Sequence, residues 1–170
     1  ILFGKEVELC LPPKKGPGQV LRIVREVLHG APNAGRTNPH EALRTLTNMA
    51  KRRCLAFFIS DFLFELRSEA LRSACAKHDL VAVQVSDPAE ESLPNVGKVR
   101  LRDPETAELV EVQTGKRAVR DYYEEQRGEW QGQVDRFLRK HRVDHIQTRT
   151  DLDYLPALRS FFQRRSRVQA

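Results

Sequence analysis

Two oxygen-bearing side chains stand at positions where a chemical site is expected. Asp61 follows the apolar run of residues 54–59, and Thr37 lies just before a helical segment. A carboxylate and a hydroxyl are oxygen ligands, which suit Mg²⁺ or Mn²⁺. Asp61 also fits a structural role, because an aspartate there can accept the free backbone N–H groups at the start of a helix. The residues alone leave both interpretations open.

The histidines and cysteines give weaker signals. The five histidines form no i,i+4 pair and no Cys/His ligand pattern, so each is expected at the surface or at a helix end; they are His29, His40, His78, His141 and His145. The three cysteines Cys10, Cys54 and Cys75 have no C-x-x-C spacing. Each lies in an apolar segment, which predicts buried free thiols in a reducing compartment.

Composition favours a single globular domain over residues 1–170. The chain is 40% hydrophobic and 31% charged, and no apolar run approaches the length of a membrane-spanning helix. It lacks a signal-peptide pattern, so we expect a cytoplasmic location. It begins inside an apolar run without an initiator Met, which indicates part of a longer polypeptide. The net charge of +6 is spread along several helices, which favours a solvated basic surface.

The element expected to position Asp61 is the run of residues 54–59. It is apolar on both faces, which is typical of a central strand of a parallel sheet covered by helices on both sides. Residues 80–85 form a second such run, and a helical segment lies between the two. The two strands should therefore be parallel, with Asp61 at the edge where ligands bind in α/β sheets.

Further elements follow from periodicity and turn residues. Asn38 can cap a helix whose first position suits Pro39, so Thr37 falls on the loop before it. The other predicted elements are strands within 1–11, helices over 19–29, 66–78, 116–141 and 151–164, a hairpin of 98–101 with 109–113, and a strand over 143–148.

The motif Leu55-Ala-Phe-Phe-Ile-Ser-Asp61, preceded by Gly35-Arg-Thr37-Asn38, resembles the von Willebrand factor A domain. More closely, the chain resembles the bacterial family called domain of unknown function fifty-eight. Further matching segments are Pro12-Pro13-Lys14-Lys15-Gly16, Val85-Ser-Asp87-Pro88, Leu93-Pro94, Arg102-Asp103-Pro104-Glu105-Thr106, Asp153-Tyr154-Leu155-Pro156 and Phe161-Phe162. As an ordered series, these short motifs span nearly the whole chain.

The resemblance implies an α/β fold. The expected architecture is a doubly wound, Rossmann-like (von Willebrand factor A-like), mostly parallel sheet with helices on both faces and an inserted β-hairpin. The first central strand of that sheet would precede Ile1 and is missing here. Two strand edges would then lie open unless they close on each other or another chain supplies the missing strand. The third alternative is that the fragment, with both edges open, is unstable alone.

The resemblance also implies a metal-ion-dependent adhesion site. Its pattern is Asp-x-Ser-x-Ser, then a Thr, then an Asp, and Thr37 and Asp61 match the last two positions. The first element would precede Ile1, so the site is incomplete. Mg²⁺ is implied for the intact protein, with none expected to bind this fragment.

The function implied by the resemblance is that of a non-enzymatic protein-interaction domain. It would act with a MoxR-type AAA+ ATPase in the assembly or activation of other proteins, in a parent chain anchored to the inner membrane through segments absent here. No nucleic-acid partner is expected.

Two alternatives remain on the residues themselves. A metal-dependent hydrolase or nuclease would use Asp61 together with Asp87, which ends the neighbouring strand. A nucleic-acid or membrane-surface binder would use the basic residues Lys14, Lys15, Arg164, Arg165 and Arg167.

Overall fold

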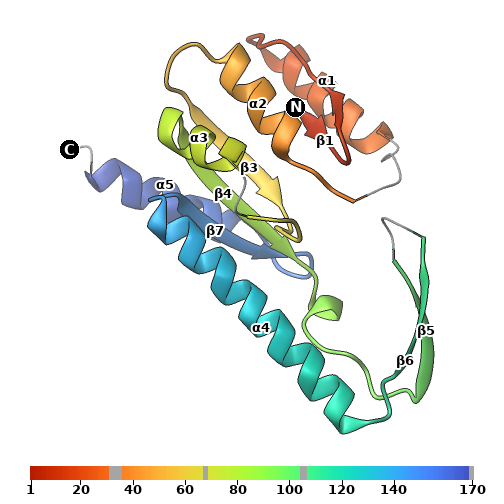
Figure 1. Cartoon of the computed structure of the whole chain (residues 1–170). Coiled ribbons are helices and arrows are strands. Elements are labelled where there is room, and N and C mark those ends of the chain that lie inside the picture. The colour runs from red at the N-terminus through yellow and green to blue at the C-terminus, as the bar shows by residue number, and fades with distance from the viewer. Residues whose placement is uncertain (31–35, 67–68, 104–106, 169–170) are drawn as a thin grey trace.

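The computed structural model describes residues 1–30, 36–66, 69–103 and 107–168. Its centre is a three-stranded sheet of β3 (Leu55–Ser60), β4 (Asp79–Ser86) and β7 (Asp144–Arg149). β4 lies in the middle and pairs in parallel with both neighbours, with Ser60 opposite Gln84 and Ser86 opposite Arg149. The predicted parallel β-α-β unit is confirmed (Figure 1).

Helices and two antiparallel strand pairs surround this sheet, within a few residues of their predicted ranges. The helices are α1 (Pro17–His29), α2 (His40–Met49), α3 (Glu69–Lys77), α4 (Arg117–Lys140) and α5 (Leu155–Val168). The strand pairs are β1 (Leu2–Phe3) with β2 (Val7–Leu9), and β5 (Lys98–Arg102) with β6 (Leu109–Gln113). A 3₁₀ turn, η1, covers Pro88–Glu90. Residues 104–106 of the predicted hairpin turn lie outside the described part of the chain.

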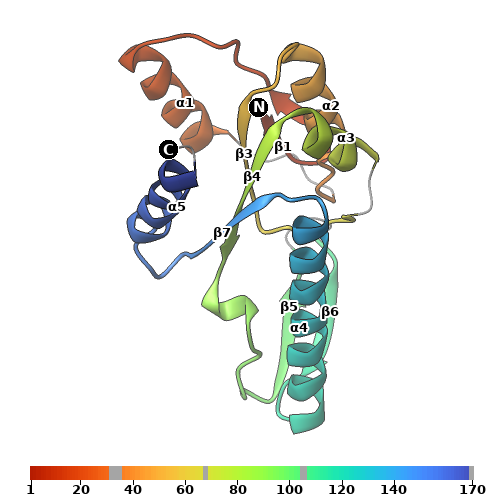
Figure 2. The same ribbon diagram turned by 90° about the vertical axis from the view of Figure 1, so that its left-hand side faces the viewer.

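Helices cover both faces of the sheet because β4 is apolar on both. Leu80 and Ala82 of β4 face a core shared with α2, α3 and α4, whereas Val81 and Val83 face a core closed by α5. In Figure 2, α5 lies on one side of the sheet and α2, α3 and α4 lie on the other. The chain is therefore a mixed α/β protein built on a parallel sheet.

The strand that the sequence places at the centre of the sheet is instead at its edge. β3 pairs only with β4 among the described residues, and its outer hydrogen-bonding edge has no strand beside it. Phe58 is buried, but Leu55, Phe57 and Ile59 on the other face are 47%, 42% and 61% exposed. The prediction that β3 is buried on both faces is therefore wrong for the described chain, which buries only the face that carries Phe58.

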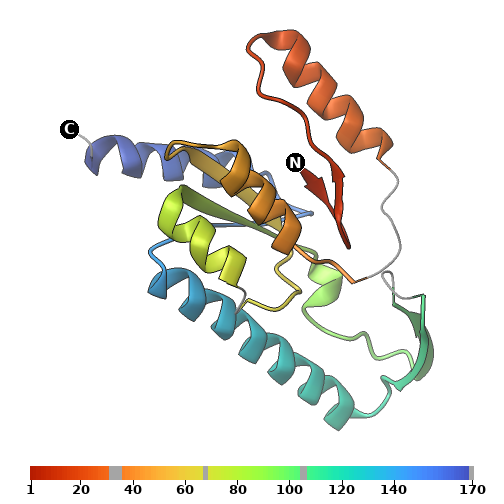
Figure 3. The same ribbon diagram turned by 45° about the horizontal axis from the view of Figure 1, so that its top comes forward.

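The N-terminal segment lies beside β3 without joining its sheet. The backbone N–H of Asn38 donates to the carbonyl oxygen of Gly4 at 2.8 Å, and the rings of Phe3 and Phe58 stack with centroids 5.6 Å apart. β1 pairs with β2 rather than with β3, so the two expected open edges do not close on each other in the described chain. α1 follows this hairpin and stands apart from the sheet (Figure 3).

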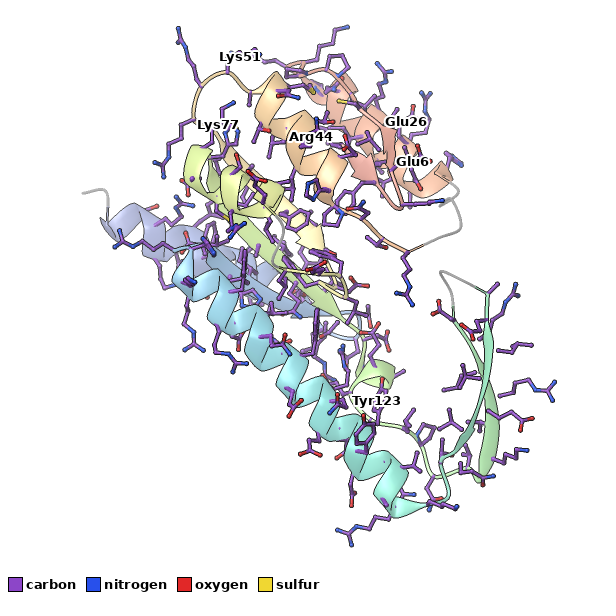
Figure 4. All side chains as sticks on the ribbon, viewed as in Figure 1. Glu6, Glu26, Arg44, Lys51, Lys77 and Tyr123 are labelled. Carbon is purple, nitrogen blue, oxygen red and sulfur yellow. The ribbon has the colours of Figure 1, made fainter. Side chains whose placement is uncertain are left out.

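Only the second half of α4 packs as predicted. Val134 and Leu138 are buried, but Tyr122 in the first half is 63% exposed. The first half extends past the sheet toward the β5–β6 hairpin (Figure 1). Tyr123 holds the nearby turn, because its hydroxyl donates to the Glu90 carbonyl oxygen at 2.9 Å (Figure 4).

α5 contacts the sheet along a narrow stripe, because Phe161 is 2% exposed whereas Phe162 and Leu155 are 47% and 45% exposed. The prediction of buried cysteines needs correction. Cys10 is exposed rather than buried, while Cys54 and Cys75 are half-buried, and all three are free thiols. None of the helices in the described ranges is both long and apolar enough to cross a membrane.

Candidate functional site

Asp61 lies directly after β3, and its side chain is used locally. Its Oδ1 accepts the hydroxyl of Ser60 at 3.2 Å and the backbone N–H of Leu63 at 3.1 Å. The residues after it form a loop, since α3 begins only at Glu69. The Asp61 carboxylate therefore does accept a backbone N–H, as the structural role required. It does so in a turn and not at the start of a helix.

The turn after Asp61 has an unusual backbone. Phe62 adopts φ +62°, a left-handed conformation that a residue with a side chain rarely takes, and it is 0% exposed. Its ring packs edge-on against Phe58 at 5.2 Å, and its N–H donates to the Ser60 hydroxyl oxygen at 3.1 Å. Burial of the ring fixes the direction in which the loop leaves the strand.

Thr37 lies in the segment that enters α2. Asn38 was predicted to cap this helix but lies one residue before the cap position, where its Oδ1 accepts the backbone N–H of His40 at 3.0 Å. Pro39 occupies the cap position and not the first helical residue, so α2 starts one residue later than predicted. Thr37 is half-buried.

Thr37 and the loop after Asp61 border the same depression, which we call the α2–α4 hollow. It has a volume of about 1750 Å³ and lies between the entry to α2, the loop after β3 and the second half of α4. Thr37 lines it, as do Leu63 and Phe64 from the loop. The two segments chosen from sequence thus meet at one hollow, while joint coordination by Thr37 and Asp61 stays a prediction.

Asp87 ends the neighbouring strand, as predicted, and also holds its own turn. Its carboxylate accepts the hydroxyl of Thr150 at 2.5 Å and the backbone N–H of Ala89 at 2.9 Å. These hydrogen bonds, in that order, hold the pKa of Asp87 below its usual value. Cooperation of Asp61 with Asp87 in hydrolysis stays a prediction.

A polar network that sequence analysis did not identify lies between the sheet and α4. Gln84 is 5% exposed, and it exchanges two hydrogen bonds with Gln131 at 2.9 and 3.1 Å. His145 Nε2 lies 3.0 Å from Gln84 Oε1, and its Nδ1 lies 3.4 Å from Asp135 Oδ1. Gln131 Nε2 also donates to Asp135 at 3.1 Å. The signal in the sequence was Gln84, the one polar residue inside an apolar strand.

His145 differs from the prediction of a surface or helix-end position, because it lies within β7 and its side chain is 18% exposed. Burial lowers the pKa of His145, and the nearby Asp135 opposes that effect. His78 ends α3 as expected but is only 1% exposed, and its Nδ1 lies 3.4 Å from Cys54 Sγ. Its pKa is also lowered, mainly by burial and then by Lys77 and Arg53. Lys77 in turn donates to the Thr47 carbonyl oxygen, which joins α3 to α2 (Figure 4).

A smaller hollow of about 580 Å³ lies at the carboxyl ends of β4 and β7. Its two arginines are neutralised: Arg127 pairs with Glu90 at 3.5 Å, and Arg149 binds Asp151 through two hydrogen bonds of 2.9 and 3.0 Å. Because these charges are satisfied within the protein, this hollow offers no net positive site for a ligand.

Comparison with known proteins identifies the family. Residues 1–132 match the family described as "Protein of unknown function DUF58", and the chain belongs to it. This confirms the family proposed from the motifs.

The chain is also similar to curated mycobacterial proteins. It is 32% identical over 138 residues to uncharacterized protein Mb1516 of Mycobacterium bovis and to uncharacterized protein Rv1480 of Mycobacterium tuberculosis; the match covers 81% of this chain and 43% of each relative. It is 30% identical to uncharacterized protein MAV169 of Mycobacterium avium over 81% of both chains. The chain thus spans less than half the length of the first two. No solved structure shows significant similarity to it.

Proposed function

We propose that this member of the family is a non-enzymatic protein-interaction domain, acting with a MoxR-type AAA+ ATPase in the assembly or activation of other proteins. The ATPase association comes from the resemblance described above. The physical support is the set of large apolar side chains on α1 and on β3 that stay exposed in the described chain. Apolar patches of this kind on soluble domains mark sites of protein or membrane contact.

The single observation that carries the proposal is the exposure of α1. None of its residues is buried. Its large apolar side chains are between 45% and 75% exposed; they are Val20, Leu21, Ile23, Val24, Val27 and Leu28. A helix with such a face gains most of its stability by packing it against something. The occupant of this face is, in our proposal, a protein surface.

The edge of β3 supports the same proposal. Its outer backbone groups have no strand beside them among the described residues, and Leu55, Phe57 and Ile59 are exposed next to them. Open apolar edges are places where a further strand adds to a sheet. We propose that the intact fold is the doubly wound, von Willebrand factor A-like sheet and that its first central strand occupies this edge.

The metal part of the proposal concerns Thr37 and Asp61. The described residues do not by themselves fit a magnesium site, because one oxygen of Asp61 already accepts two local hydrogen bonds and the predicted ligands are only two. We propose that the adhesion-type site is incomplete in this chain. In the intact protein, the missing Asp-x-Ser-x-Ser element would supply the remaining protein ligands.

The test is binding to a purified MoxR-type ATPase from the same organism, measured by biolayer interferometry. The double variant Leu21→Ser/Leu28→Ser alters two side chains that are 69% and 75% exposed, so folding should be unaffected. We expect it to weaken binding by roughly tenfold or more, since apolar anchors dominate such contacts. The matched control is Arg22→Ser, also exposed on α1. Equal binding by the double variant and the wild type would refute the proposal.

A second candidate, a membrane-surface binder, is favoured by one observation. The exposed Lys14 and Lys15 lie just before α1, so its apolar face is preceded by positive charge. Amphipathic helices with basic residues bind anionic lipid surfaces. Co-sedimentation with anionic but not neutral vesicles, lost in the Leu21→Ser/Leu28→Ser variant, would favour this candidate over a protein partner.

A further inference from the structure

Four cations and three carboxylates of the described chain line the α2–α4 hollow; they are Arg36, Arg72, Arg136 and Lys140, and Glu65, Asp103 and Glu129. Arg72 lines it from α3, and Arg136 and Lys140 line it from the end of α4. All three side chains are exposed, and among the described residues none of them forms an ion pair. This differs from the smaller hollow, where Arg127 and Arg149 are already paired with carboxylates.

Two of these cations, Lys140 and Arg72, lie near His141. His141, which also lines the hollow, has a pKa lowered first by burial and then by Lys140 and Arg72, so both cations act on the same point. The guanidinium group of Arg136 reaches back along α4 toward Gly132, where a Cβ atom would lie 3.1 Å from its Nη1. Arg72, Arg136 and Lys140 thus line one hollow from two helices.

The floor of the hollow is apolar. Phe64 and Leu66 are 7% and 5% exposed, and the half-buried rings of Trp130 and Phe137 lie beside them along α4. A ligand that uses both features must carry negative charge and apolar side chains together. An amphipathic protein segment has this chemistry, and a simple anion does not.

The remaining charges decide between two kinds of anionic macromolecule. The carboxylates of Glu65, Asp103 and Glu129 also line the hollow. A nucleic-acid strand carries a phosphate at every step and would bring some of them against these carboxylates. A peptide can place its carboxylates only where the cations are, so the arrangement favours a peptide.

We propose that the α2–α4 hollow binds an acidic amphipathic segment of a partner protein, with carboxylates on Arg72, Arg136 and Lys140 and apolar side chains on Phe64, Leu66 and Trp130. The proposal rests on the function proposed above, that of a protein-interaction domain, and adds a second contact surface distinct from α1 and β3. Complementary charge would speed encounter and select the partner, while the apolar floor would supply affinity.

The probe is a fluorescein-labelled helical peptide of about 14 residues, built from Glu, Ala and Leu, whose length matches the stretch of α4 along the hollow. Binding to the whole chain is followed by fluorescence anisotropy. We expect binding at about 50 mM salt that weakens clearly at about 300 mM. The variant Arg136→Glu/Lys140→Glu should weaken it by roughly tenfold or more, since two attractive pairs become repulsive.

The matched control is Arg159→Glu/Arg164→Glu, which reverses two exposed charges on α5, outside the hollow. It should bind the peptide like the wild type. A peptide with Ser in place of Leu should bind roughly tenfold more weakly, which distinguishes an amphipathic ligand from a simple anion.

Three outcomes would overturn the proposal: no peptide binding at low salt, equal loss in both charge variants, or tighter binding of single-stranded DNA of the same length that depends on Arg136 and Lys140. The last result would assign the hollow to nucleic acid. If the peptide fails while Leu21→Ser/Leu28→Ser still abolishes ATPase binding, only the hollow is wrongly assigned and the proposed function stands.

Discussion

The indole N–H of Trp130 donates to the backbone carbonyl oxygen of Phe62 at 3.1 Å. This contact joins the middle of α4 to the turn after β3, 68 residues away in sequence. Phe62 is the buried residue with a left-handed backbone, so its carbonyl is held at a point where the chain is strained. The bond positions the loop that carries Asp61 and closes one side of the α2–α4 hollow.

Replacing Trp130 with Phe should remove this hydrogen bond and keep most of the apolar contact. We expect the free energy of unfolding to fall by about 1–2 kcal/mol, because a partly buried carbonyl loses its donor. Urea unfolding followed by circular dichroism measures the change. Tyr122→Phe is the control, since this ring is on the same helix and 63% exposed, and its effect should stay within about 0.5 kcal/mol. Equal effects of both substitutions would contradict the assigned role.

His145 should make stability depend on pH. Burial lowers its pKa in the folded protein below the ordinary value of about 6.5, so the unfolded chain binds the proton more readily. Its contribution is therefore fully present above the unfolded pKa and is lost as the pH falls toward the folded pKa. His78 and His141 have lowered pKa values as well and act in the same direction.

Urea unfolding of His145→Gln between about pH 5 and pH 8 isolates this contribution. The variant should show a shallower fall of stability in acid than the wild type, because one buried titrating group has been removed. His29→Gln, which replaces a histidine at an exposed helix end, is the control for the substitution itself. A variant curve parallel to the wild-type curve would show that His145 does not contribute to the slope.

Arg165 should hold α5 against the sheet. It pairs with Asp79 of β4 and with Asp144 of β7, and its guanidinium carbon lies 5.4 Å from the ring centroid of Phe161. We expect Arg165→Ala to lower the free energy of unfolding by about 1 kcal/mol, with a smaller loss at high salt. Arg164→Ala, exposed on the same helix, should have almost no effect in the same urea titration. Indistinguishable variants would show that the ion pairs contribute little.

Magnesium should bind this chain only in the millimolar range or more weakly. Thr37 and Asp61 are only two of the oxygen ligands that octahedral Mg²⁺ needs. Asp61 also already accepts hydrogen bonds from Ser60 and Leu63. Isothermal titration of the wild type and of Asp61→Ala should give the same weak signal. Tight binding that Asp61→Ala abolishes would mean that the site is complete within this chain.

Local patterns were sufficient for most of the elements. The parallel pairing of β3 with β4 follows from two apolar runs separated by a helical segment, and the structure has both strands and the helix. A helix beginning near Asn38 and Pro39 was also predictable, although the cap position is Pro39 and not Asn38. These features depend on short-range chemistry, which a single sequence displays.

The candidate sites depend on contacts between residues that are far apart in the sequence. Thr37 and Asp61 could be named from their motif, but the motif does not predict the hollow that their segments border. The cations Arg72, Arg136 and Lys140 are ordinary charged residues in their own helices. Their spacing in the sequence does not show that they line the same hollow. Gln84 was the clue to the polar network, but its partners Gln131 and His145 are 47 and 61 residues away.

The clearest division concerns β3 and β4. The sequence by itself determined that both are apolar on both faces and parallel, because the type and order of residues set the tendency toward burial. Only the tertiary structure decided that β4 has strands on both sides and helices over both faces, whereas Leu55, Phe57 and Ile59 of β3 stay exposed at an open edge. Burial tendency is a property of a segment, but the cover that satisfies it comes from distant parts of a chain or from another molecule.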